Sequence, residues 1–340
     1  MSVTVRRARY ESESDEVVEL LQANLPYRVH ARYFNWLYRQ NPAGEALAWV
    51  AVDSSTHRIV GAAAAFPRTV FFSGRKARGY VLGDFCIHRT HRSLGSALAL
   101  QRACLDGLSA DNGEFAFDFP SKSMVAVYNR LRIAIDDSVV RYVKLLRADF
   151  AIARRVRNRA AARVLSGIAN AGLRELEVFV RGNRGWTVSV APAPWGSEFS
   201  EAAWKWTPAS AITVARTTEY LNWRYAAHPQ HRYEMVAARK NGILGGYMLR
   251  HETDAGFVID DLLAGDTSAY GALLSEAIAT GRSHKAQSIV TPWPVNDPGR
   301  HVLERFGFRS RGSSPAVLLR LSQAGGQCSA CSLFHADWEV

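Results

Sequence analysis

The residues best suited to chemistry lie in one short stretch, residues 81–100. An apolar segment, Val81–Ile87, leads through a polar turn to the small residues Gly95, Ser96 and Ala97 at the expected start of a helix. The first amides of a helix have no acceptor within the helix and carry a positive partial charge, so such a terminus can bind phosphate. Glycine lets a diphosphate come close to the main chain. The stretch predicts a site for a phosphorylated ligand, although its glycine spacing matches neither a Rossmann fingerprint nor a Walker A loop.

Cysteine and histidine residues form no comparable pattern. Cys328 and Cys331 have the spacing of half a zinc site, but the chain has no second cysteine pair, and His335 adds one ligand at most. We therefore expect no metal site. Cys86 and Cys104 lie in apolar segments, where burial is expected and where the spacing indicates no base that would activate a thiol.

The elements around this stretch predict a mixed α/β fold. Two helical segments precede several strands, and a helix of about Leu94–Leu108 separates the strand Val81–Ile87 from the strand Glu114–Phe119. A strand–helix–strand unit of this kind forms a right-handed crossover between parallel strands. We therefore expect these two strands to be parallel.

A short repeat divides the chain into two halves. Residues 33–38 (YFNWLY) recur as residues 220–225 (YLNWRY), and a proline follows each copy at the same distance. An apolar strand and a glycine-containing strand come next in both halves, and Gly83-Asp84-Phe85 is echoed by Asp260-Asp261-Leu262. Because these matches occur in the same order, we interpret the chain as two copies of one α/β fold.

The segment Arg92–Ala97 resembles the pyrophosphate loop of the GNAT superfamily of N-acetyltransferases. That loop reads Gln or Arg, two residues, Gly, one residue, then Gly or Ala, and this segment reads Arg-Ser-Leu-Gly-Ser-Ala. The strand before it, the helix and strand after it, and the helix that carries Tyr128 follow the order of the family. The resemblance covers Arg6 to Phe150 well and the second half in outline. It implies a fold of class α/β (α+β), with two GNAT-like mixed-sheet domains in tandem.

The expected domain boundaries follow from the resemblance and the repeat. We expect a GNAT-like acyl-CoA-binding domain at residues 1–150, a helical basic linker with connecting strands at 151–200, a degenerate GNAT-like domain at 201–325 and a C-terminal tail at 326–340.

The resemblance implies an N-acyltransferase that moves an acyl group, acetyl or a related one, from acyl-CoA to a primary amine by direct attack. Tyr128 matches the family tyrosine that protonates the departing thiolate; the alternative is a core tyrosine. Asp84 would take a proton from the attacking ammonium, bind that ammonium, or serve as a structural residue at a strand bulge. The residues expected to contact acetyl-CoA or another acyl-CoA are Phe85, Cys86, Ile87, Arg92, Ser93, Leu94, Gly95, Ser96, Ala97 and Ser121.

Several residues depart from the family pattern. Ser121 stands where the family often has Asn, and Arg132-Ile133 replaces the usual Gly-Phe. The corresponding loop of the second half, residues 267–272, lacks the leading Arg or Gln, and Leu303 falls where Tyr128 falls in the first half. We therefore expect CoA in the first half only, with the second half shaping the acceptor site or stabilising the pair.

Charge and composition leave the partner open. The chain has 42 Lys and Arg residues against 31 Asp and Glu, a net charge of +11, which favours anionic partners without choosing among them. The arginines of residues 154–163 indicate either a solvated helix face or contact with an anionic partner. No recognisable nucleic-acid module is present, so nucleic acid is not expected. No apolar run is long enough to span a membrane and no secretory leader is evident, so we expect a cytoplasmic protein.

Two alternative functions remain at this stage. One is an aminoacyl transferase of related fold that uses charged tRNA in cell-wall or polysaccharide chemistry, and the other is a non-catalytic GNAT-like binding protein. The acceptor amine, which could belong to a small molecule, a sugar or a peptide, is not determined by the sequence, nor are the acyl chain and the oligomeric state.

Overall fold

The computed structural model describes residues 3–135, 137–178, 185–208, 212–295, 297 and 299–321. The predicted tail, residues 326–340, lies outside the described residues, and so do its cysteines, Cys328 and Cys331.

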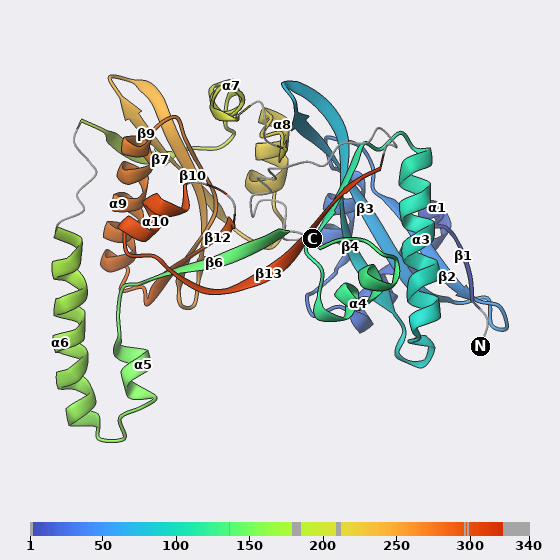
Figure 1. Cartoon of the computed structure of the whole chain (residues 1–340), viewed down its shortest axis with the longest axis horizontal. Helices are drawn as coiled ribbons and strands as arrows, with labels where there is room; N and C mark the ends of the chain where they lie inside the picture. The colour runs from blue at the N-terminus through green and yellow to red at the C-terminus, as the bar shows by residue number, and fades with distance from the viewer. Residues whose placement is uncertain are drawn as a thin grey trace.

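The first half of the chain contains the strand–helix–strand unit expected from the sequence (Figure 1). Its elements are β1 (Val3–Arg7), α1 (Tyr10–Asn24), α2 (Ala31–Phe34), the π-helix η1 (Asn35–Arg39), β2 (Leu47–Asp53), β3 (Ile59–Phe72), β4 (Arg75–Ile87), the 3₁₀ turn η2 (Arg89–His91), α3 (Leu94–Ala110), β5 (Phe115–Asp118), α4 (Lys122–Arg130) and β6 (Asp137–Leu145).

The second half repeats this order after a helical connection. Its elements are α5 (Asp149–Ala153), α6 (Arg159–Val178), β7 (Thr187–Ala191), α7 (Ser197–Trp206), β8 (Thr213–Val214), α8 (Thr218–Leu221), the π-helix η3 (Asn222–Ala226), β9 (Tyr233–Lys240), β10 (Ile243–Thr253), β11 (Gly256–Ala264), α9 (Thr267–Ser283), β12 (Ser288–Pro294), α10 (Arg300–Arg305) and β13 (Arg309–Arg320).

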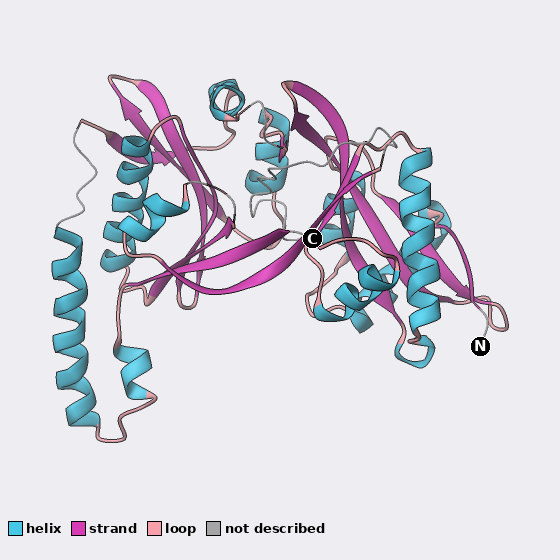
Figure 2. Ribbon diagram, viewed as in Figure 1, coloured by secondary structure: helices cyan, strands magenta, loops and turns pink. Residues whose placement is uncertain are grey.

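The described strands form one mixed sheet that runs through both halves (Figure 2). Its order is β1-β2-β3-β4-β5-β13-β6-β12-β11-β10-β9-β7, with β8 paired to β3. The pairs β4–β5 and β11–β12 are parallel and the others are antiparallel. The predicted mixed α/β fold is therefore confirmed, as is the parallel pairing of the strands that flank α3.

Strands β6 and β13 join the two halves. β6 lies within the predicted first domain, residues 1–150, yet it pairs with β12 of the second half and with residues 309–316 of β13. The last residues of β13, 317–320, pair with β5 of the first half. Each half thus pairs with a strand that belongs to the other half in sequence, so neither half completes its sheet alone.

The sheet of the first half carries a helical layer on each face. Successive residues of a strand point to opposite faces. Ala62, Ala64 and Phe66 of β3 accordingly belong to one core cluster with α1 and η1, whereas Ala63 and Ala65 pack toward α3 and α4. Cys86 and Cys104 are buried in these two layers, as their apolar surroundings predict.

The repeated segments contact each other. The rings of Trp36 and Trp223, which hold the same place in the two repeats, stack with centroids 4.9 Å apart. The indole N–H of Trp36 donates to the carbonyl of Trp223 at 3.0 Å, and that of Trp223 donates to the carbonyl of Trp36 at 3.1 Å. Because each half makes the same bond to the other, the two copies meet across an approximate two-fold axis.

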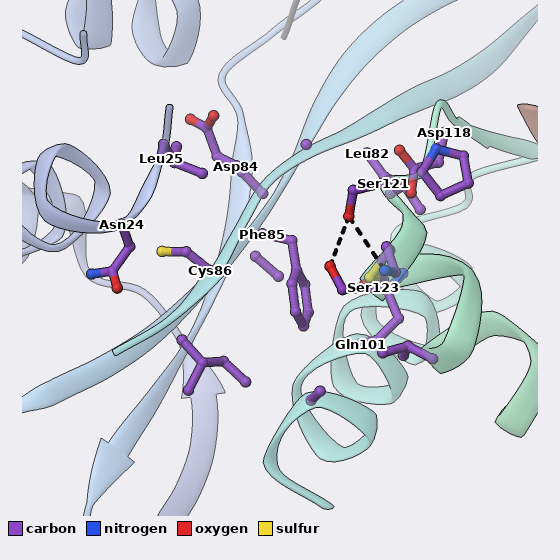
Figure 3. Close-up of a pocket in the computed structure, with 18 of the residues that line it drawn as sticks. Asn24, Leu25, Leu82, Asp84, Phe85, Cys86, Gln101, Asp118, Ser121 and Ser123 are labelled. Carbon is purple, nitrogen blue, oxygen red and sulfur yellow. Dashed lines mark hydrogen bonds between the residues drawn. The ribbon is translucent and has the colours of Figure 1, made fainter. Parts of the chain in front are cut away.

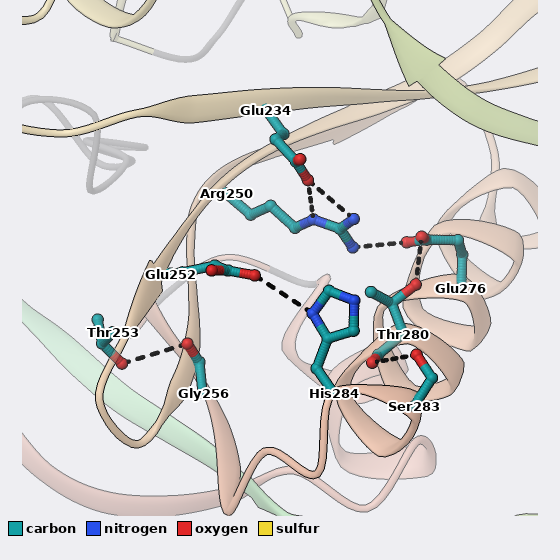
Figure 4. A network of polar contacts seen from close by, with 9 residues as sticks. All are labelled: Glu234, Arg250, Glu252, Thr253, Gly256, Glu276, Thr280, Ser283 and His284. Carbon is teal, nitrogen blue, oxygen red and sulfur yellow. Dashed lines mark hydrogen bonds and ion pairs between the residues drawn. The ribbon is translucent and has the colours of Figure 1, made fainter.

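Helix α9 is fixed to the sheet of the second half by a buried arginine (Figure 4). The guanidinium of Arg250 donates to Glu234 on β9 at 3.1 Å and to Glu276 on α9 at 2.9 Å. The Thr280 hydroxyl donates to the same Glu276 carboxylate at 2.8 Å. This network joins one face of the sheet to the helix that covers it.

The basic segment forms a helical hairpin, whereas the sequence predicted one helical stretch. α5 ends at Ala153 and α6 begins at Arg159, so the five arginines of residues 154–163 lie on the turn and at the start of α6. None of the described helices combines the length and the apolar content needed to cross a lipid bilayer.

Candidate functional site

The parallel strands β4 and β5 separate after a short stretch of pairing. Residues Gly79–Val81 pair with Phe115–Phe117, and no pairing continues from there, although β4 runs on to Ile87. Beyond Val81 the two strands have no ladder between them, so the main chain of residues 82–87 on the side toward β5 is available to a ligand. This divergence forms the wedge in which the site lies.

A bulge in β4 lies at the same place. Ala62 pairs with Cys86 and Ala64 with Gly83, so Asp84 and Phe85 stand opposite the single residue Ala63. Asp84 has a φ of 49°, in the left-handed region that residues other than glycine adopt infrequently. A bulge of this kind redirects a side chain and interrupts the ladder of hydrogen bonds.

A cavity of about 740 Å³ fills the wedge and extends to both sides of β4. In Figure 3, Phe85 and the hydrogen-bonded pair Ser121 and Ser123 lie on one side of the strand, and Asp84 lies near Leu25 on the other. The cavity is lined by Asn24, Leu25, Pro26, Tyr27, Ala63, Ala64, Val81, Leu82, Gly83, Asp84, Phe85, Cys86, Ile87, Arg92, Ser93, Leu94, Ala97, Gln101, Asp118, Phe119, Pro120, Ser121, Ser123, Met124 and Val127.

The N-terminus of α3 opens toward the mouth of this cavity. The Ser93 hydroxyl caps the helix by accepting from the Ser96 amide at 3.1 Å, which leaves the amides of Leu94 and Gly95 without an acceptor inside the helix. A Cβ atom at Gly95 would have only Ser93 Oγ within 4 Å, at 3.9 Å. The space beside Gly95 is therefore open, and the helix terminus can accept an anionic group there.

Arg92 lies at the same end of the cavity. Its Nε donates to the Ile87 carbonyl at 3.0 Å and one terminal nitrogen donates to Asn24 Oδ1 at 3.3 Å. These bonds hold an exposed positive charge beside the terminus of α3.

Tyr128 is fully buried and its hydroxyl does not line the cavity. The hydroxyl donates to Asp118 Oδ2 at 2.6 Å, and Gln101 Nε2 donates to the hydroxyl at 3.4 Å. Asp118 and Gln101 both line the cavity. Burial raises the pKa of Asp118 to about 6, although the bonds from Tyr128 and from the Phe119 amide oppose this rise.

Asp84 is 3% exposed and is bonded to two tyrosines. The Tyr38 hydroxyl donates to Asp84 Oδ2 at 2.6 Å, and the Tyr27 hydroxyl donates to Oδ1. Burial raises the pKa of Asp84 above its ordinary value, and the two hydroxyl bonds limit the rise. The hydrogen-bond donors to this carboxyl group are thus neutral tyrosines and not a cation. Because no cation in the described part of the chain fixes the carboxylate in its charged form, Asp84 can exchange a proton.

The structure brings most of the predicted site residues together. Asp84, Phe85, Cys86, Ile87, Arg92, Ser93, Leu94, Ala97 and Ser121 line the cavity. Gly95 and Ser96 lie at the exposed start of α3, and Tyr128 is buried behind the lining.

Sequence reasoning did not identify Asp118, Tyr27 and Gln101. Asp118 ends β5, and the end of a strand that faces a crevice in an open sheet is a place where ligand-binding residues are expected. Tyr27 and Gln101 carry no local signal of this kind, because only the packing of α1 and α3 brings them to β4.

In the second half, the corresponding helix terminus, that of α9, is not available to an anionic ligand. The Asp266 carboxylate caps α9 by accepting from the amides of Ser268 and Ala269 at 2.8 and 2.9 Å, so an acidic side chain takes these donors and would repel phosphate. Asp261, the counterpart of Asp84, forms a buried ion pair with Arg216 at 2.9 Å. Its charge is balanced by a cation, unlike that of Asp84.

Cysteine and metal chemistry receive no support from the described residues. Burial raises the pKa of the Cys86 thiol to about 12, which keeps the thiol protonated. Within the described ranges, no group of three or more His, Cys, Asp or Glu side chains could hold a metal ion.

Comparison with known proteins places this geometry in context. Residues 4–132 match the family model described as an acetyltransferase (GNAT) domain. No curated protein matches this sequence.

Three solved structures illustrate the similarity in fold. A conserved protein of Enterococcus faecalis, described as a probable N-acyltransferase, is 13% identical with a TM-score of 0.69 over 94% of this chain and 73% of its own. Eis1 of Mycobacterium abscessus is 16% identical with a TM-score of 0.61 over 94% and 74%. A tandem GNAT protein from the clavulanic acid biosynthesis pathway is 13% identical with a TM-score of 0.58 over 95% and 100%.

Proposed function

Since residues 4–132 of this chain match the model of the GNAT acetyltransferase domain, we propose that the protein is an N-acyltransferase that transfers an acyl group, acetyl in the first instance, from acyl-CoA to a primary amine. The observation that carries this proposal is the wedge between β4 and β5, with a cavity that reaches from the terminus of α3 to Asp84.

The residues of the wedge fit the acyl-CoA substrate. The open space beside Gly95 and the amides at the start of α3 suit its diphosphate, with Arg92 adding positive charge. The unpaired edge of β4 at residues 85–87 suits the amides of the pantetheine arm. Bound acyl-CoA supplies a thioester whose carbonyl carbon an amine can attack.

Main-chain donors of the bulge polarise the thioester carbonyl. Phe85 follows the left-handed residue Asp84, and the ladder with β3 is interrupted at these two residues. An N–H held by the backbone needs no reorganisation as negative charge develops on the carbonyl oxygen, and one such donor is worth about 10²-fold or more in rate.

Asp84 accepts a proton from the attacking ammonium. It lies on the side of β4 where Tyr27 and Leu25 line the cavity, which we assign to the acceptor. Its raised pKa makes it a stronger base than an exposed aspartate, and Tyr38 and Tyr27 keep its two oxygens oriented.

Tyr128 acts as the general acid together with Asp118. The Tyr128 hydroxyl lies behind the cavity lining and donates to Asp118, which does line the cavity. When Asp118 is itself protonated and donates to the phenol oxygen, the Tyr128 proton is released from this bond and becomes free for a departing thiolate that reaches past the lining. The raised pKa of Asp118, about 6, makes this protonated form accessible near neutral pH. A thiol of pKa about 8.5 needs only modest help as a leaving group.

Calorimetric titration with acetyl-CoA tests the site. Gly95→Glu places a carboxylate in the space assigned to the diphosphate, and it should abolish binding without disturbing the fold, because a Cβ atom fits there. Gly172→Glu on α6 is the matched control, since a Cβ atom at Gly172 likewise fits without a clash and has no atom within 4 Å, and this variant should bind acetyl-CoA like the wild type. Equal affinity of the Gly95→Glu variant and the wild type would refute the site.

Release of free CoA thiol with a panel of primary amines tests the reaction. The wild type should release thiol with at least one acceptor class among small-molecule, amino-sugar and peptide amines. Tight binding of acetyl-CoA without release across the panel would favour the non-catalytic alternative.

A further inference from the structure

Helices α5 and α6 form a hairpin that projects from the end of the second half (Figure 1). The hairpin is held mainly by its own contacts. Ala162 and Ser166 of α6 are buried, Asn170 Oδ1 accepts from the Ala148 amide at 2.8 Å, and Asn170 Nδ2 donates to Asp149 at 3.1 Å. These residues define the face of α6 that packs against α5.

The opposite face of α6 is apolar and exposed. With 3.6 residues per turn, positions 161, 164 and 168 fall on the side away from Ala162 and Ser166, and positions 165 and 172 lie at the edge of that side. Val164, Leu165 and Ile168 on this side are 63%, 47% and 66% exposed. A surface helix of a globular protein turns its apolar face inward, so this arrangement is inverted and requires a partner.

Arginines gather at one end of the hairpin, three on the turn between α5 and α6 and two at the start of α6. Arg154, Arg155, Arg157, Arg159 and Arg163 are all exposed, and none of them forms an ion pair with a carboxylate in the part of the chain that the structure describes. Residues 150–173 contain these five arginines and no Asp or Glu. Next to them, the Phe150 ring is 58% exposed and lies 5.8 Å from the guanidinium of Arg154.

We propose that this hairpin docks onto an anionic lipid surface. The aliphatic face of α6 and Phe150 enter the boundary between headgroups and acyl chains, and the arginines bind the lipid phosphates. A helix of 20 residues spans about 30 Å along the membrane plane. The proposal is independent of the acyl-transfer reaction, because the hairpin shares no residue with the cavity.

The combination of features favours lipid over two other occupants. Nucleic acid would pair with the arginines but would leave Val164, Leu165 and Ile168 in water. A second copy of the chain would cover the aliphatic face but would bring two sets of unpaired arginines together, and like charges repel. An anionic bilayer satisfies both the charge and the apolar surface.

Co-sedimentation with vesicles tests the proposal. The full chain should bind vesicles that contain phosphatidylglycerol, and binding to vesicles of phosphatidylcholine alone should be far weaker. The double variant Arg155→Gln/Arg157→Gln should weaken binding about 30-fold, since each arginine near an anionic surface is worth about fivefold. Val164→Gln/Ile168→Gln should weaken it about tenfold or more, because it removes the aliphatic groups and keeps the charge.

A matched control separates this surface from the overall basic charge. Arg32→Gln/Arg102→Gln removes two exposed arginines of the first half and should bind vesicles like the wild type. Circular dichroism shows whether each variant is folded. Equal binding to both lipids, equal loss in the control, or no binding at all would overturn the proposal. So would hairpin-dependent binding to duplex DNA, or a dimer that Val164→Gln/Ile168→Gln dissociates, if either occurs without vesicle binding.

Discussion

Replacing Asp118 with asparagine gives the sharpest test of the electrostatics of the site. The asparagine side chain has the same shape and its oxygen can still accept the Tyr128 hydroxyl, so the variant removes the titrating proton and keeps the main contact. Any change that depends on pH then reports the ionisation of Asp118.

The size of the effect follows from the pKa. In the folded state the pKa of Asp118 rises from 3.8 to about 6 because burial disfavours the carboxylate. The folded protein therefore holds this proton at pH values where the unfolded chain has lost it, and stability falls as pH rises through this window. Complete ionisation of Asp118 lowers the free energy of unfolding by about 3 kcal/mol. About 1.4 kcal/mol of this loss occurs between about pH 5 and about pH 8.

Urea unfolding at these two pH values measures the difference. Relative to the wild type, Asp118→Asn should be more stable at about pH 8 than at about pH 5 by about 1.4 kcal/mol. Asp106→Asn is the matched control for the removal of one aspartate charge, because Asp106 is an exposed carboxylate on α3. A stability difference between Asp118→Asn and wild type that stays constant with pH would refute the raised pKa and the proton relay built on it.

Three further variants probe the remaining parts of the site and fold. Tyr128→Phe should slow thiol release about tenfold or more while acetyl-CoA binding in calorimetry stays the same; unchanged release removes Tyr128 from the mechanism. Asp84→Asn should lower kcat/KM by about 10²-fold or more and should remove the loss of activity on acidification, because the wild-type base is protonated below its raised pKa; a pH–rate profile that keeps this limb contradicts the assignment. Trp223→Ala should destabilise the chain by about 3–5 kcal/mol in urea unfolding, since it removes the stack on Trp36 and one of the paired bonds; a loss near zero would show that the two halves do not depend on this contact.

Predictions from local patterns agree well with the structure. The run of small residues Gly95, Ser96 and Ala97 after an apolar strand predicted the start of α3. The recurrence of residues 33–38 predicted the second copy of the fold. These features depend on backbone geometry and on periodicity over a few residues. Both are determined by residues that are close together in the sequence.

The chemical environment of the site could not be predicted in the same way. The sequence proposed Tyr128 as a candidate, but it gave no sign of the contact with Asp118, because the two residues meet only when α4 packs over β5. The bonds of Tyr27 and Tyr38 to Asp84 join residues 57 and 46 positions apart. The acidity of these groups is set by burial and by such partners, and neither can be read from the adjacent sequence.

The sequence by itself determined the mixed α/β class, the repeat and the helix terminus suited to phosphate, since each follows from short-range spacing. Only the tertiary structure decided that β6 and β13 cross between the halves, that β4 and β5 diverge after Val81, and that Asp84 faces tyrosines while Asp261 faces Arg216. These features arise where segments that are distant in the sequence pair along the same sheet edge or pack into the same buried volume. Their outcome depends on the packing of the whole molecule.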